Sequence, residues 1–137
     1  MWLQLTPDLI LSRVVGPEKA ALDSAAKDAA QFEILSDVAA LVSSEWRGAI
    51  ARAVPIDKRR GFVPDELMIH ILADFRYRAA TRIPNIKALL DDRRVEEWER
   101  ANKVRDDLLG TFAIEPPEDA APSNNAPLMT VPPSIFD

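Results

Sequence analysis

The sequence contains no cysteine and a single histidine, His70. Without cysteine the chain cannot form disulfides, thiolate nucleophiles or zinc–thiolate sites, and it suits a reducing cytoplasm. His70 lies between Ile69 and Ile71 in a segment with a helical pattern, and no second histidine can complete a metal site or a catalytic triad. We therefore expect a packed or surface-edge imidazole, no catalytic residues, no metal and no cofactor.

Glycine and long apolar runs are also scarce. The chain has four glycines, which lie too far apart to build a phosphate-binding loop. Charged residues interrupt each apolar stretch well before it could span a bilayer. The first residues carry no basic segment of the kind that opens a secretion signal. The sequence therefore predicts neither a membrane partner nor a secreted protein.

Carboxylates are frequent, but they occur as adjacent pairs in segments predicted to be helical. The pairs are Asp91-Asp92, Glu96-Glu97 and Asp106-Asp107. Adjacent residues of a helix do not face each other, so none of these pairs forms an acid/base couple. Arginine and lysine residues lie between them at spacings that allow i,i+4 ion pairs, which is typical of a solvated helix face. We expect a protein that is not an enzyme.

Five helices, separated by proline, glycine and a basic loop, account for most of the 137 residues. Their expected bounds are about 7–15, 18–30, 33–53, 64–83 and 86–109, with a break near 91–92 in the last. The predicted fold class is all-α: a small bundle of four to five helices over residues 1–111, followed by an extended proline-rich arm over residues 112–137.

Two of these helices carry clear apolar stripes at three- and four-residue spacing. The stripe of the third helix comprises Leu35, Val38, Leu41, Val42, Trp46, Ala49, Ile50 and Ala53. The stripe of the fourth comprises Leu67, Met68, Ile71, Leu72, Phe75 and Ala79. We predict that these residues form the core.

The C-terminal arm differs in composition from the rest of the chain. After Thr111 there are six prolines and four acidic residues but no lysine or arginine, so the arm supplies most of the net charge of −5. Prolines exclude helix and central strand, yet apolar side chains cluster near the end of the arm. Apolar residues on an extended segment favour docking on a partner. The candidate partner-binding residues are Leu128, Met129, Val131, Ile135 and Phe136.

A second candidate site is the basic loop around Lys58, Arg59 and Arg60. Three consecutive cations flanked by prolines could contact phosphate groups or the acidic rim of a partner. The same residues could equally form an ordinary solvated loop. The sequence alone leaves both interpretations open.

The order of these features resembles the head-to-tail adaptor (connector) proteins of tailed bacteriophages and prophages, of the Mu-like, head-completion type. The resemblance covers residues 3 to about 112. It is carried by four motifs: Leu3-Gln4-Leu5-Thr6-Pro7, Phe62-Val63-Pro64-Asp65-Glu66-Leu67, Phe75-Arg76-Tyr77-Arg78 followed by Thr81-Arg82-Ile83-Pro84, and Arg94-Val95-Glu96-Glu97-Trp98-Glu99-Arg100-Ala101.

The resemblance implies a structural virion protein of the phage neck, assembled in the bacterial host cytoplasm. Such adaptors are helical bundles that form a ring, commonly of twelve copies, between the portal protein and the stopper or tail-completion proteins. DNA passes through the ring as cargo. On this view residues 57–62, with Lys58, Arg59 and Arg60, are a candidate channel-facing loop, and nearby acidic residues should moderate its charge.

The alternative is a small helical DNA-binding or regulatory protein. Its contact surface would be Arg76, Arg78 and Arg82, or the loop at Lys58. The acidic net charge and the absence of a helix-turn-helix spacing weigh against this alternative.

Overall fold

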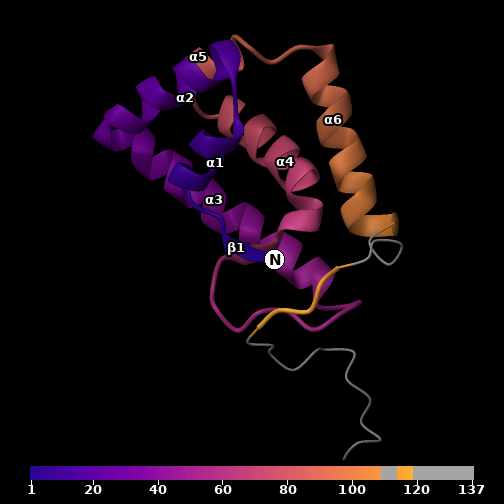
Figure 1. The fold of residues 1–137 in the computed structure, drawn as a ribbon. Helices are drawn as coiled ribbons and strands as arrows, with labels where there is room; N and C mark the ends of the chain where they lie inside the picture. Colours follow the sequence, from indigo (N-terminus) through magenta and orange to yellow (C-terminus); the bar gives the residue numbers. More distant parts are fainter. Residues whose placement is uncertain (109–113, 119–137) are drawn as a thin grey trace, which may run out of the picture.

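A computed structural model describes residues 1–108 and 114–118 of the chain (Figure 1). The elements in this part are, in order, β1 (Trp2–Gln4), α1 (Pro7–Arg13), α2 (Gly16–Lys27), α3 (Ala29–Ile50), β2 (Phe62–Pro64), the 3₁₀ helix η1 (Asp65–Leu67), α4 (Met68–Ala80), α5 (Pro84–Lys87), α6 (Asp92–Lys103) and the π-helix η2 (Val104–Leu108). The predicted helical bundle is confirmed.

Short polar side chains begin three of the helices. The Thr6 hydroxyl accepts a hydrogen bond from the Leu9 N–H at 3.2 Å at the start of α1. Asp28 caps α3 through the Gln31 N–H, and Asp91 caps α6 through the Arg94 N–H at 2.9 Å. Each cap satisfies an N–H group that the first turn leaves without an intrahelical partner. The break expected near residues 91–92 is confirmed, since α5 ends at Lys87.

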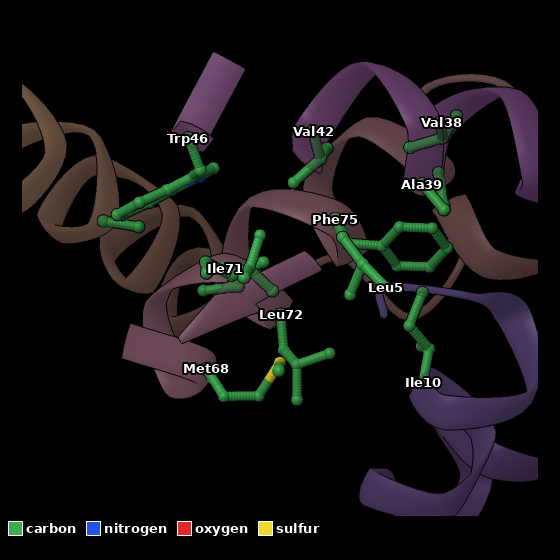
Figure 2. Packing of buried hydrophobic residues seen from close by; sticks show 14 of the residues in the cluster. Leu5, Ile10, Val38, Ala39, Val42, Trp46, Met68, Ile71, Leu72 and Phe75 are labelled. Atoms are coloured by element: carbon green, nitrogen blue, oxygen red, sulfur yellow. The ribbon is translucent and has the colours of Figure 1, made fainter. Parts of the chain in front are cut away.

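The core lies between α3 and α4, with α1, α2 and β1 closing one side (Figure 2). Val42 of α3 points toward Ile71 and Phe75 of α4, whereas the Trp46 indole of α3 reaches Asp74 of α4. The side chains of Val42, Trp46, Ile71 and Phe75 are all buried. Every core residue predicted for the fourth helix is buried. This contact joins the two most apolar helix faces in the chain and supplies the main hydrophobic stabilisation.

Two predictions for the third helix are wrong. Leu41 is 42% exposed, because it lies beyond the edge of the buried arc of α3. Ala53 is exposed as well, because α3 ends at Ile50 and turns carry the chain away from the bundle. A spacing of three or four residues placed Leu41 beside the stripe but did not fix the edge of the stripe.

The sequence also gave no sign of the small antiparallel sheet formed by β1 and β2. Leu3 pairs with Val63, and Trp2 and Gln4 pair with Pro64 and Phe62. Two three-residue strands that lie about sixty positions apart show no measurable alternation of apolar and polar residues. The sheet brings the start of the chain to the segment that follows the basic loop.

The helix α6 attaches to the bundle mainly through polar and aromatic contacts. It stands beside α4 at the edge of the molecule (Figure 1). The Trp98 ring stacks on Tyr77 of α4 with centroids 3.8 Å apart, and Ala101 is buried. Ion pairs join Arg94 of α6 to Glu18 of α2, and Glu18 in turn contacts Arg76 of α4. Ion pairs therefore contribute to holding α6 against the bundle, whereas apolar packing holds α3.

Asp74 is a fully buried carboxylate at the junction of α3, α4 and α6. Its two oxygens accept hydrogen bonds from the indole N–H groups of Trp46 and Trp98, at 3.0 and 3.2 Å. They also accept from Arg78 at 2.8 Å and from Arg105 of η2 at 3.2 Å. Two donors on each oxygen compensate the loss of hydration that burial imposes on the carboxylate.

Residues 114–118, which we call the strap, lie against the start of the chain (Figure 1). Ile114 packs on the core, and the Trp2 indole N–H donates to the Glu115 carbonyl oxygen at 2.8 Å. The Glu115 N–H donates to the Glu66 carboxylate. The predicted boundary between residues 111 and 112 falls outside the described residues and stays a prediction, but this part of the predicted arm contacts the helical body.

Candidate functional site: a groove with a basic rim

An open groove of about 850 Å³ lies between α3, the end of β1 and the basic loop. One wall is formed by residues 4–7, which lead from β1 into α1. The other wall is the face of α3 that carries Ser36, Ala40 and Ser44, and the loop from Lys58 to Gly61 closes one end. The small side chains of α3 leave the space that the groove occupies.

Arg47 holds the loop against α3. One of its terminal nitrogens donates to the Asp57 carbonyl oxygen and the other to the Phe62 carbonyl oxygen, both at 2.7 Å. The Leu5 N–H donates to the Gly61 carbonyl oxygen at 2.9 Å, which fixes the far wall to the same loop. Burial lowers the pKa of Arg47, although Asp57 acts in the opposite direction. Arg47 therefore fixes the loop beside the groove by binding the backbone carbonyl groups of Asp57 and Phe62.

Asp57 organises the interior of the loop. Its fully buried carboxylate accepts from the Arg59 backbone N–H and Nε, both at 2.9 Å, and from Arg59 Nη2 at 2.7 Å. The Arg59 hydrogen bonds lower the pKa of Asp57, overcoming the opposite effect of burial. The Arg59 guanidinium also lies 3.9 Å from the centroid of the Phe62 ring.

Gly61 completes the loop with a φ of +83°, a left-handed conformation that glycine adopts without strain. A Cβ at this position would lie 3.7 Å from Cγ of Gln4, so steric room is not the constraint. The backbone conformation itself favours glycine here. It turns the chain from the loop into β2.

The three cations of the basic loop thus have different surroundings. Lys58 and Arg60 are exposed and line the groove, and Arg59 pairs with Asp57. Nearby acidic residues were expected to moderate the positive charge of the loop, and Asp57 pairs with one of its three cations. Leu128, Met129, Val131, Ile135 and Phe136 lie outside the described residues, so the structure does not place the predicted partner-binding residues near the loop or away from it.

The sequence interpretation missed Arg47 and the small-residue face of α3. Ser43 and Ser44 of this face both line the groove: Ser43 is buried and Ser44 is exposed. The available signal was spacing: residues 36, 40, 43, 44 and 47 share one helix face and carry serine, alanine and arginine. Among the described residues, no large apolar side chain fills the space in front of this face.

Arg76, Arg78 and His70 were also singled out from the sequence, and each lies among other side chains of the same chain. Arg76 pairs with Glu18 and Glu97, and Arg78 pairs with Asp74 and Glu45, so both guanidinium groups face carboxylates of the same chain. His70 is half-buried, and burial together with the nearby Arg100 lowers its pKa. In the described part of the chain no cluster of acidic or histidine side chains could hold a metal ion. No helix of that part is both long and apolar enough to cross a membrane.

Comparison with known proteins returned no matching family model, no curated relative and no similar solved structure.

Proposed function

We propose that this protein is a head-to-tail adaptor: a structural virion protein that forms a ring between the portal protein and the stopper or tail-completion proteins around the DNA channel. The proposal assigns it no catalytic activity. Its partners are other copies of itself, the portal protein and a stopper or tail-completion protein, with DNA as passing cargo and no membrane. It would act in the virion neck after assembly in the bacterial host cytoplasm.

The observation that carries the proposal is how the motifs of the resemblance meet in space. Leu3 of the first motif pairs with Val63 of the second in the β1–β2 sheet. Tyr77 of the third stacks on Trp98 of the fourth, and Arg76 lies 3.9 Å from Glu97. Motifs distant in sequence thus form two junctions of the bundle, as expected if together they specify one fold.

The architecture supports an assembly role on physical grounds. A body of this size buries a modest core, so contacts with neighbouring subunits would add substantially to its stability. The groove offers an open surface at one side, and the strap leads into the segment that carries the apolar candidate residues. Many identical weak contacts around a ring yield high avidity without a strong individual interface.

Electron microscopy of the purified protein, alone and with a portal protein from the same genome, tests the proposal. We expect closed rings, and a complex with the portal that survives size-exclusion chromatography. A protein that stays monomeric and does not bind the portal protein would contradict the adaptor function.

The same preparations test the DNA-binding alternative. Two of its three helix arginines are already paired with carboxylates of the chain, which weakens the contact surface that this alternative requires. Binding to short duplex DNA that weakens steeply with salt, in a protein that does not form rings, would favour this alternative.

A further inference from the structure

We propose that the groove receives residues 119–137 of a neighbouring copy, so that adjacent subunits of the assembly are linked by exchanged C-terminal segments. This inference rests on the homo-oligomer of the proposed function and names the acceptor surface within it. It commits to one occupant, which is a second copy of this chain.

The size and lining of the groove suit a short stretch of extended chain. Its volume of about 850 Å³ lies within the range of ~300–1,000 Å³ typical of ligand pockets. Serines and alanines along α3 permit close approach of a backbone, and Leu5 and Pro7 add an apolar wall. Phe32, 40% exposed, continues the same face of α3 one turn before Ser36. Apolar side chains such as Ile135 and Phe136 have a surface to cover there.

Charge complementarity favours the same occupant. Among the described residues that line the groove, Arg47, Lys58 and Arg60 are basic and none is acidic. Residues 119–137 carry Asp119 and Asp137 and no lysine or arginine. A basic rim that meets an acidic segment steers the encounter and fixes its direction.

The strap sets the starting point and the reach. Trp2 and Glu66 hold Glu115 at the beginning of β1, a few residues before the segment begins in the sequence. Residues 119–137 span at most about 60 Å when extended, whereas a body of this size has a radius of gyration of about 13 Å. The four prolines of the segment favour an extended backbone over a helix. The segment is therefore long enough to reach a neighbour.

Disulfide trapping tests the exchange directly, because the chain has no cysteine of its own. We would mix a Ser44→Cys chain with a differently tagged Ser134→Cys chain under mild oxidation and follow the mixed dimer on non-reducing gels. Docking holds the sulfurs at about millimolar effective concentration, so the dimer should form at least ~10-fold faster than between free micromolar chains. Ser24→Cys, at an exposed position of α2, replaces Ser44→Cys as the matched control.

The charge of the rim gives a second measurement. Arg60→Glu should slow trapping between the Ser44→Cys and Ser134→Cys chains by about two- to fivefold. Lys87→Glu, a reversal at an exposed position of α5 outside the groove lining, should leave the trapping rate unchanged.

Three outcomes would overturn the inference. Equal trapping at Ser44→Cys and Ser24→Cys would mean that the groove is not the acceptor. A chain carrying both Ser44→Cys and Ser134→Cys that closes only on itself would mean that each segment occupies its own groove. A trapping rate that Arg60→Glu leaves unchanged would mean that the segment does not meet the basic rim of the groove. If rings form while trapping fails, the groove inference fails alone; if neither rings nor portal complexes form, the proposed function fails.

Discussion

Asp74 shows how one residue can set the relative placement of three helices. It lies on α4, and its carboxylate gathers an indole from α3, an indole from α6 and a guanidinium from η2. A buried ion pair contributes little net stability compared with apolar packing. Removing one partner is costly, because the other charge then stays buried without compensation, and the paired groups specify one arrangement. Asp74 therefore fixes where α6 sits against the more apolar α3–α4 pair.

Replacing Asp74 by Asn tests this role. The substitution keeps the volume but removes the charge and turns an N–H₂ group toward N–H donors, so the free energy of unfolding should fall by about 3–5 kcal/mol in urea titration. Asp37→Asn, at an exposed position of α3, should change it by no more than about 0.5 kcal/mol. A loss below about 1 kcal/mol at Asp74 would contradict the role described here.

His70 should make stability pH-dependent near neutrality. Its pKa is lowered in the folded state, so the unfolded chain binds the proton more tightly. The contribution of His70 is therefore fully present above its ordinary pKa of 6.5 and declines as the pH falls from there toward the folded-state value. The urea midpoint should drop less for His70→Gln than for the unaltered chain between pH 7.5 and 5.5. Identical drops would exclude His70 as the cause.

At the scale of elements, some helix starts were predictable because their signals are local. Thr6 caps α1 and Pro17 lies in the first turn of α2, close to the predicted starts of these helices. The start of α3 was predicted wrongly, because Asp28 caps a helix that begins at Ala29 rather than near residue 33. The β1–β2 pair was not predictable, because its stability comes from a partner strand distant in sequence rather than from local pattern. The exposure of Leu41 follows from tertiary packing in the same way.

Among the larger helices α6 should open most readily, because stacking and charge pairs hold it more than apolar burial does. Trp98→Leu removes the stack on Tyr77 and one hydrogen bond to Asp74. Amide hydrogen exchange in α6 should then accelerate about 10- to 100-fold relative to α4. Glu99→Gln, at an exposed position of the same helix, is the control. Equal acceleration in α4 would mean that the two helices open as one unit.

At the scale of the whole molecule, the strap contacts the helical body, and truncation can measure what these contacts add to its stability. A chain ending at residue 118 should melt within ~2 °C of the full protein, whereas one ending at residue 113 should melt about 5 °C lower. The second chain loses the contacts of Ile114 and Glu115 with the body. Both should lose attachment to the portal. Equal melting of the two truncated chains would mean that the strap adds nothing to stability.

Sequence reasoning could identify only part of the candidate site. The cluster of Lys58, Arg59 and Arg60 was visible as a charge run, but their different surroundings depend on Asp57, whose burial no local pattern reveals. The groove itself arises where residues 4–7, α3 and the loop converge. A concave surface built from three distant segments is a property of topology.

The three tryptophans have a practical consequence, because each indole nitrogen donates a hydrogen bond across a different contact. Trp2 bonds to the strap, and Trp46 and Trp98 approach Asp74 from opposite helices. Intrinsic fluorescence thus reports the events that matter: detachment of residues 114–118 through Trp2, and loosening of α6 through Trp98. Single-tryptophan variants would let either event be followed in unlabelled protein while subunits associate.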